Sequence, residues 1–286
     1  MKKILFILGH NRLTGVNTWA VTLGDFLIRR GYIVDFEIKR DIDYNTKIDG
    51  IITQLQTLKT SIFTKVFPDY NSYDYCFVNY NIHQKFVKPE RTIFVSHGSM
   101  YEPYRPLGKV YKHVAVTGRS QEILNAEVVI NNGIDLDKFS PTTGCRNHPR
   151  TAINIFRGIP NYSLYKSCEN LGIQLSHIAV EDDVYLHITK NDFVVGYGRS
   201  CYEGMAMGKP VLVHGVFGHD GWIKPENFET FLFRNCSGWS NHLQLTLQEL
   251  QTVIEQYNPE DGPVNRKLAE KYLSAELMTT KFEELF

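Results

Sequence analysis

Glycines, a carboxylate and two basic side chains gather in residues 194–215, which read VVGYGRSCYEGMAMGKPVLVHG. Glycine lets a ligand approach the backbone, and the free amides at the start of a helix favour an anion. The stretch is not a P-loop, because Gly204 and Gly208 stand one residue too close and Pro210 replaces the hydroxyl residue. It also lacks the dinucleotide fingerprint, since Cys201 stands where that pattern needs its third glycine.

The same residues predict a strand, a tight turn and a short helix from Ser200 to Met207. Ser200 would cap this helix, and Gly208 would end it. A phosphate would lie on the turn, where the Arg199 guanidinium adds a positive charge and paired N–H donors. The Glu203 carboxylate, about one turn into the helix, can accept two hydroxyl donors, as the vicinal diol of a ribose offers. The stretch therefore fits a sugar-phosphate, and an ordinary turn with a surface glutamate and arginine is the alternative.

These residues need a sheet to position them, and the chain alternates between strand and helix patterns. Residues 2–8 contain the continuous apolar run Ile4–Leu8, typical of a strand buried on both faces. Apolar residues at helical spacing follow over residues 16–30, Gly31 ends that helix, and a second strand covers residues 32–38. Further short strands are expected at residues 73–79, 91–98, 113–118, 127–133, 152–156, 175–180, 192–196 and 210–215. The alternation predicts an α/β fold with parallel sheets.

Two domains are expected, because 286 residues can build two cores of ordinary size. Residues 1–140 would form the first domain and residues 152–286 the second, which ends in a helical tail. Residues 141–151, rich in proline, threonine, glycine and charge, would be the linker. Ligands of such folds lie outside the carboxyl ends of the strands. The segments at these ends are residues 9–17, His97, Asn132–Gly133, Arg157 and Gly196–Ser200.

Composition argues against several classes of protein. No apolar run approaches the roughly 20 residues that span a bilayer. The apolar run Ile4–Leu8 is too short for a signal peptide, and no small-residue cleavage site follows it. The five cysteines are far apart, which favours neither a disulfide framework nor a zinc site. A cytoplasmic protein is expected.

Three segments resemble those of glycosyltransferase family 4, the group 1 glycosyl transferases, which are retaining enzymes of GT-B fold. The family signature E-G-F-G-x-x-x-x-E-A-M-A-x-G-x-P-V is similar to V-G-Y-G-R-S-C-Y-E-G-M-A-M-G-K-P-V at residues 195–211. VINNGIDLDKFSP at residues 129–141 resembles the family's V-I-x-N-G-I-D-x-x-x-F-x-P at the interdomain boundary. TGVNTWAVTLGDFLIRRGYIV, starting at Thr14, resembles its first loop and helix. The order and spacing of the segments also match.

This resemblance implies two Rossmann-like domains that face each other across a cleft, with a C-terminal helix. It gives catalytic roles to His97 beside the transferred sugar, to Arg157 as a clamp on the diphosphate, and to Glu203 on the ribose. The residues that it places against the donor sugar and diphosphate are Gly15, Val16, Gly196, Tyr197, Gly198, Arg199 and Ser200. Lys166 would be the partner lysine, although its gap from Arg157 is wider than the family shows.

The family also implies a mechanism. A sugar moves with retention from a nucleotide-sugar, here expected to be UDP-linked, in a front-face displacement without a metal. The leaving phosphate can take the acceptor's proton. Among carboxylate pairs that could suggest a metal, Asp41/Asp43 and Asp135/Asp137 are weak candidates, and Asp135 fits a turn better.

One position departs from the signature. Val195 replaces its first glutamate, which contacts the donor sugar in the family. A non-catalytic protein that binds a nucleotide-sugar is therefore the main alternative. An unrelated NAD-binding enzyme on a similar scaffold is a third hypothesis, which the missing glycine fingerprint weakens.

The distribution of charge along the chain gives an indication of which acceptor molecule the protein would bind. Residues 1–120 hold 17 Lys and Arg against 10 Asp and Glu, and the other residues hold 14 against 21. A basic first half favours an anionic partner, although chance scatter of solvated charges gives the same asymmetry. Compatible acceptors are DNA with hydroxymethylated bases, an anionic envelope polymer, or a lipid-linked precursor at a membrane face.

Overall fold

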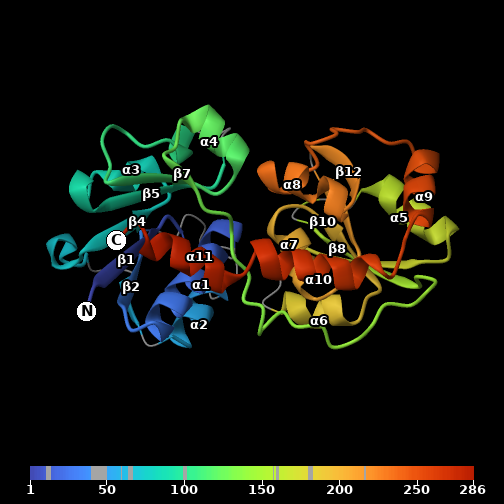
Figure 1. Ribbon diagram of the computed structural model, residues 1–286, viewed down its shortest axis with the longest axis horizontal. Coiled ribbons are helices and arrows are strands. Elements are labelled where there is room, and N and C mark those ends of the chain that lie inside the picture. Colours follow the sequence, from blue (N-terminus) through green and yellow to red (C-terminus); the bar gives the residue numbers. More distant parts are fainter. Residues whose placement is uncertain are drawn as a thin grey trace. The chain divides into compact units, whose positions relative to one another are not determined.

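The computed structural model describes residues 1–10, 14–39, 50–58, 60–63, 67–98, 102–156, 158, 161–179, 183–215 and 217–286. Contacts divide the chain into two units (Figure 1). The first contains Met1–Gly133 and Ala275–Phe286, and the second contains Ile134–Ser274. Each unit has its own sheet with helices packed on it, which confirms the predicted α/β class.

In the first unit, seven described strands form one parallel sheet in the order β3-β2-β1-β4-β5-β6-β7. The strands are β1 (Lys3–Leu8), β2 (Ile33–Ile38), β3 (Ser61–Phe63), β4 (Tyr75–Val78), β5 (Thr92–Ser96), β6 (Lys112–Ala115) and β7 (Val128–Val129). The order reverses between β1 and β4, so the carboxyl ends of these two strands border a switch point.

The helices of the first unit cover its two sheet faces unequally. They are α1 (Gly15–Arg29), α2 (Gly50–Gln56), α3 (Asn81–Gln84), α4 (Gly118–Leu124) and α11 (Ala275–Glu283), with 3₁₀ turns at Tyr70–Ser72, Pro89–Arg91 and Glu102–Tyr104. One face packs against α1, α2 and α11 through a core that contains Phe6, Trp19 and Phe282. The other face carries the smaller cluster around Ile7 and Phe94.

The second unit has a five-stranded sheet in the order β12-β11-β10-β8-β9. Its strands are β8 (Thr151–Ile155), β9 (Gln174–Ile178), β10 (Phe193–Gly196), β11 (Val211–Gly215) and β12 (Gly218–Trp222). Of these described strands, β12 alone runs antiparallel to its neighbour. The helices are α5 (Tyr162–Asn170), α6 (Val184–Thr189), α7 (Arg199–Ala206), α8 (Pro225–Phe233), α9 (Leu247–Glu255) and α10 (Asp261–Tyr272).

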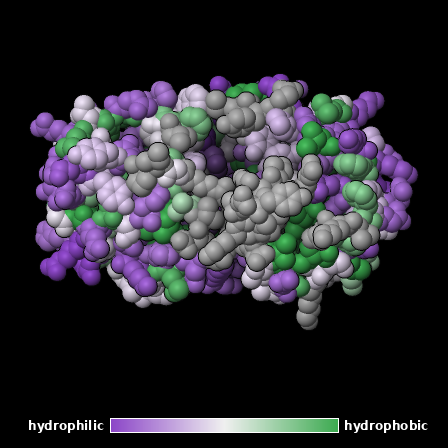
Figure 2. Space-filling model, turned by 180° about the vertical axis from the view of Figure 1, so that it is seen from behind, coloured by the Kyte–Doolittle hydropathy of each residue, from purple (hydrophilic) through white to green (hydrophobic). Residues whose placement is uncertain are grey.

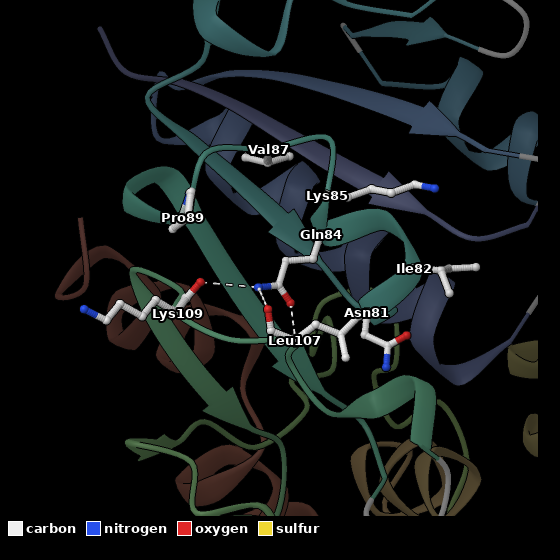
Figure 3. Close-up of a pocket in the computed structure, with 8 residues that line it drawn as sticks. All are labelled: Asn81, Ile82, Gln84, Lys85, Val87, Pro89, Leu107 and Lys109. Atoms are coloured by element: carbon white, nitrogen blue, oxygen red, sulfur yellow. Dashed lines mark hydrogen bonds between the residues drawn. The ribbon is translucent and has the colours of Figure 1, made fainter.

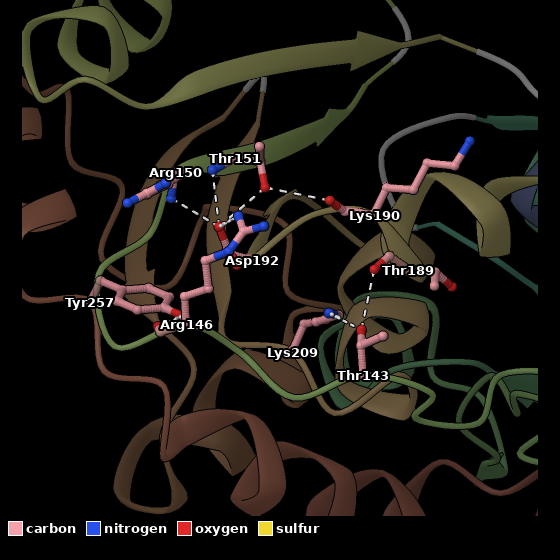
Figure 4. A network of polar contacts seen from close by, with 9 residues as sticks. All are labelled: Thr143, Arg146, Arg150, Thr151, Thr189, Lys190, Asp192, Lys209 and Tyr257. Carbon is pink, nitrogen blue, oxygen red and sulfur yellow. Dashed lines mark hydrogen bonds and ion pairs between the residues drawn. The ribbon is translucent and has the colours of Figure 1, made fainter.

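The predicted linker, residues 141–151, belongs to the second unit, which already begins at Ile134. Asp192, which precedes β10, fastens the end of this segment to the sheet (Figure 4). Its Oδ2 accepts hydrogen bonds from the backbone amides of Arg150 (2.9 Å) and Thr151 (3.0 Å) and forms an ion pair with Arg146 (3.1 Å). Composition predicted a linker between domains, whereas in the structure this segment is a loop of the second unit whose last amides are bonded to Asp192.

The C-terminal tail divides between the units, whereas the sequence assigned it wholly to the second. Helix α10 lies in the second unit, and α11 returns to the first. On α11, Met278 and Phe282 are buried in the first unit's core. Arg30, at the end of α1, forms ion pairs with Glu276 (2.6 Å) and Glu283 on α11. Helical spacing predicts that a helix forms, and it does not show which core will cover its apolar face.

No helix in the described part of the chain has the length and apolarity that a bilayer crossing requires. On the face drawn in Figure 2, apolar residues (green) form small groups among polar ones. Such groups are ordinary on a protein surface.

Candidate functional site

The glycine-rich stretch lies where the strand order of the second sheet reverses. Strand β8 pairs with β9 on one side and with β10 on the other, so β8 and β10 border a switch point. Their carboxyl ends are in register, with Ile155 beside Gly196. Ligands of open α/β sheets bind outside the carboxyl ends of the strands at such a point.

The turn between β10 and α7 requires glycine at two positions. A Cβ on Gly196 would lie 2.5 Å from the Ser200 Oγ, too close for any contact. Gly198 has φ +59° and ψ −129°, a conformation that residues with a side chain rarely adopt. Its amide donates a hydrogen bond to the Cys236 carbonyl (3.0 Å). The close turn leaves the start of α7 at the edge of the sheet.

Ser200 does not cap α7 as predicted. The helix starts at Arg199, and Gly198 occupies the cap position. The Ser200 hydroxyl instead donates to the Tyr197 carbonyl (2.8 Å) and accepts from the Tyr197 amide (3.2 Å). Ser200 therefore closes the turn from inside the helix, and its side chain is buried there.

Glu203 and Arg199 form an ion pair one helical turn apart, with 2.9 Å between Arg199 Nε and Glu203 Oε1. Only 12% of the Arg199 side chain and 9% of the Glu203 side chain are exposed. Burial raises the pKa of Glu203, and the neighbouring Arg199 charge opposes that shift. The ion pair is thus largely buried, and it holds both side chains in place. This contradicts the alternative of a surface glutamate and arginine.

Helix α7 approaches the sheet closely because Gly204 has no side chain. A Cβ there would lie 2.9 Å from Val211 Cγ2 and 3.0 Å from Val194 Cβ. The helix therefore packs directly on β10 and β11, and Glu203 is held against the second unit's core.

Tyr197 lies beside the carboxyl ends of two further strands. Its ring packs against Gly215, where a Cβ would meet it at 3.0 Å. It makes an edge contact with Phe156 at 5.7 Å between ring centroids. Both aromatic rings therefore border the same edge of the sheet as the glycine turn.

The basic residues of the second half have different places in the structure. Arg157 follows Phe156 in the chain and lies outside the described residues. Lys166 lies on α5 and forms an ion pair with Glu169 at the surface. Lys209 is buried, and its Nζ lies 3.3 Å from the Thr143 hydroxyl (Figure 4). Since Lys209 precedes β11, it belongs to the amino edge of the sheet and lies away from the glycine turn.

Sequence reasoning missed the residues after α8 that support the Gly198 turn. Asn235 (φ +61°) and Cys236 (φ +46°) are consecutive left-handed residues with side chains. The Tyr202 hydroxyl donates to Asn235 Oδ1 (3.0 Å), and the Cys236 carbonyl accepts the Gly198 amide. Such backbone conformations persist only where the surroundings enforce them. Nothing in the sequence pattern marked this pair.

Three predicted residues lie at the carboxyl edge of the first sheet. Gly15 begins α1, with Thr14 as the cap, and open space surrounds the position of its missing Cβ. Val16 is largely buried, so its side chain belongs to the first unit's interior. His97 follows β5 and makes an edge contact with Trp19 at 4.7 Å between ring centroids.

His97 is a neutral imidazole at the end of its strand. Its Nε2 is buried and has no hydrogen-bond partner among the described residues. Burial lowers the pKa of His97 to about 3. A buried ring nitrogen without a partner is costly, which makes it a candidate for a contact with a ligand.

Asp135, by contrast, has a structural role. Its Oδ1 accepts hydrogen bonds from the backbone amides of Asp137 (3.0 Å) and Lys138 (3.1 Å). This is a turn stabilised by an aspartate, as predicted. Asp41 and Asp43 lie outside the described residues.

Two histidines on neighbouring strands predict a dependence of stability on pH. His219 on β12 is 1% exposed, and its ring lies 5.7 Å from that of His214 on β11. Burial lowers the pKa of His219 from 6.5 to about 4, so the unfolded chain binds more protons between these values. Stability should therefore fall by on the order of 2–3 kcal/mol as the pH drops through this range.

Urea denaturation across this pH range checks the expectation. The variant His219→Gln should have a shallower slope, because the contribution of His219 is removed while buried His97 still contributes, whereas His148→Gln, at an exposed position, should keep the wild-type slope. An unchanged slope in His219→Gln would assign the acid sensitivity to other groups.

Comparison with known proteins supports the fold at low sequence identity. No protein-family model and no curated protein matches the chain. Anabaena HepE, solved in complex with UDP and glucose, aligns with a TM-score of 0.64 at 13% identity over 99% of each chain. A glycosyltransferase from Rickettsia africae gives a TM-score of 0.60 at 12% identity over 99% of this chain and 97% of the other. S. aureus TarM, solved with UDP, gives a TM-score of 0.54 at 11% identity over 100% and 99%.

The chain therefore has the GT-B fold of two Rossmann-like domains. The GT-B fold describes how the strands and helices are arranged and does not by itself give a function. Because the same fold can carry unrelated sites, the function has to be argued from the residues at the sheet edges.

Proposed function

We propose that the protein is a retaining glycosyltransferase that moves a sugar from a nucleotide-sugar to a hydroxyl acceptor without a metal. The observation that carries this proposal is the buried Glu203 carboxylate, paired with Arg199 beside a glycine turn at the switch point. A buried carboxylate at this place can accept the two hydroxyl groups of a ribose, while the adjacent amides and helix start favour its phosphates.

Each group would act on a different part of the donor. Backbone at Gly196 and Gly198 would approach the diphosphate, and Arg157 would stabilise the charge that develops on it. The bond between the anomeric carbon and the phosphate oxygen would break as the acceptor oxygen attacks from the same face. The departing phosphate oxygen would take the acceptor's proton. His97, neutral and with an unpartnered Nε2 among the described residues, would hydrogen-bond the transferred sugar.

The structural neighbours support a uridine nucleotide as the donor carrier. HepE was solved with UDP and glucose, and TarM was solved with UDP. For the acceptor, the basic first half of the chain supports an anionic molecule such as modified DNA or an envelope polymer. A cytoplasmic site of action is part of the same proposal.

The test is a thermal-shift panel with UDP, GDP, ADP, NAD and a set of UDP-sugars, followed by a turnover assay on the sugar that binds. A ligand that binds the native state raises the melting temperature. We expect stabilisation by UDP and one UDP-sugar, and release of UDP when an acceptor is present. Stabilisation without turnover on any acceptor would favour the non-catalytic alternative, to which Val195 points. Stabilisation by NAD alone, or by none of these nucleotides, would overturn the proposal.

A further inference from the structure

The connection between β4 and β5 brings little helix onto the first sheet. The connection from β4 to β5 contains only the four-residue helix α3 and the 3₁₀ turn Pro89–Arg91. The buried cluster on this side contains Ile7, Val87 and Phe94. Because α3 is short, apolar side chains at its surface remain in contact with solvent.

A groove of about 550 Å³ runs along this thin cover. It lies between α3, the turn after it and the segment that leads to β6 (Figure 3). Its lining residues are Asn81, Ile82, Gln84, Lys85, Val87, Pro89, Leu107 and Lys109. Ile82 is 60% exposed and Leu107 is 64% exposed, so two large aliphatic side chains project at the groove.

The position of Leu107 is fixed by the protein. The Gln84 side chain accepts a hydrogen bond from the Leu107 amide (2.7 Å) and donates to the carbonyls of Leu107 (3.1 Å) and Lys109 (3.3 Å). Figure 3 shows these bonds crossing the groove from α3 to the opposite segment. Gln84 is itself buried, so the exposed leucine stands on a rigid support.

Two lysines, Lys85 and Lys109, line the groove at its opposite sides (Figure 3), and Lys88 follows Val87 in the chain. Residues 81–112 contain six Lys and Arg and two Asp and Glu. Lys85, Lys88 and Lys109 are exposed, and none of them forms an ion pair with a described carboxylate. In Figure 3 the side chains of Lys85 and Ile82 point to the same side of the view. Glu90 is the one carboxylate of residues 81–98.

We propose that this surface, formed by Ile82, Leu107 and the three lysines Lys85, Lys88 and Lys109, docks on an anionic lipid bilayer. Ammonium groups at a membrane surface are attracted by acidic headgroups, and aliphatic side chains between them can enter the interface. A soluble polyanion would satisfy the lysines but would leave Ile82 and Leu107 in water. Charge complementarity together with projecting aliphatic groups therefore favours the bilayer. Membrane docking of this kind does not depend on the proposed enzymatic function.

Vesicle co-sedimentation of the full chain tests the proposal, with phosphatidylcholine vesicles and with vesicles that also contain phosphatidylglycerol. We expect binding to the anionic vesicles only, and weakening as salt is added. Replacing Lys85, Lys88 and Lys109 by glutamine should weaken binding about 100-fold, since each lysine contributes about fivefold. The double variant Ile82→Gln, Leu107→Gln should weaken it about tenfold or more. Both variants change exposed side chains, so their melting temperatures should match the wild type.

A matched control variant distinguishes vesicle binding by this surface from attraction by the net charge of the protein. Replacing Lys190, Lys267 and Lys271, which are exposed in the second unit, removes the same charge and should leave vesicle binding unchanged. No binding to anionic vesicles overturns the proposal, as does equal weakening by the two lysine triplets. Binding of polyphosphate, a soluble polyanion, is compared with binding of the anionic vesicles. If it binds this surface and the Ile82 and Leu107 substitutions leave vesicle binding intact, the partner is a soluble polyanion and the bilayer proposal is wrong.

Discussion

Replacing Glu203 by glutamine is expected to weaken UDP binding roughly 10- to 100-fold. Hydrogen bonds to a charged group contribute about 1.5–3 kcal/mol, and a neutral amide offers one acceptor where the carboxylate offers two oxygens. The substitution keeps the size of the side chain and one hydrogen bond to Arg199. The free energy of unfolding should therefore fall by only about 1 kcal/mol. Isothermal titration with UDP measures the affinity, and urea denaturation measures the stability.

A deoxy ligand makes this test specific for the ribose. The wild type should bind UDP more tightly than 2′-deoxy-UDP, because one hydroxyl donor is lost. The Glu203→Gln variant should discriminate much less between the two nucleotides. A difference that is the same in both proteins would place the ribose elsewhere, even if overall affinity fell.

The chain contains a matched control for the ion pair. Arg266 and Glu270 on α10 have the same spacing as Arg199 and Glu203, with 2.7 Å between Nε and Oε1, but Glu270 is 51% exposed. Glu270→Gln should leave UDP binding unchanged and cost well under 1 kcal/mol, as exposed pairs do. If both variants lowered UDP affinity equally, the effect would not belong to the switch-point site.

The sequence predicted the elements of both units well because buried parallel strands leave a strong local signal. The runs at residues 2–8 and 192–196 contain apolar residues on both strand faces, and both became central strands. The glycines of the turn were also informative, since Gly196 and Gly198 each need the absence of a side chain. These features depend on residues close together in the chain.

Features that depend on distant residues could not be predicted in this way. The burial of Glu203 follows from Gly204 packing on Val194 and Val211, which a pattern of residue types does not measure. The left-handed Asn235 and Cys236 have no local signature at all. The departure of α11 from the second unit depends on a tertiary contact, in which Gly133 leaves room for Ala275 and Met278.

The clearest conflict between the family resemblance and the structure lies at Val195. The resemblance implies that a glutamate at this position contacts the donor sugar. Here Val195 is fully buried in a cluster with Phe193, Leu212 and Trp222. Its partner in register on β8 is Asn154, whose Oδ1 is buried without a hydrogen-bond partner among the described residues. A side chain at residue 195 thus faces a packed apolar core with one amide beside it.

Val195→Glu should therefore destabilise the protein by about 3 kcal/mol or more, rather than restore a sugar contact. The cost combines the lost burial of valine with the desolvation of a carboxyl group. Thermal denaturation should show a decrease in melting temperature of roughly 10 °C. Leu186→Glu, at a position that is 47% exposed on α6, makes the same kind of change at the surface and should cost far less.

The pH dependence of the Val195→Glu variant distinguishes a buried carboxyl group from one that reaches a ligand. When protonated, the introduced carboxyl group could donate a hydrogen bond to Asn154 Oδ1, so its folded-state pKa would be raised above the unfolded value of about 4.3. The folded state then binds more protons, and stability relative to Val195→Gln should fall as the pH rises from that value. If Val195→Glu instead kept its stability at neutral pH and bound UDP-sugar more tightly, residue 195 would face the donor, and the buried arrangement of β10 would be wrong.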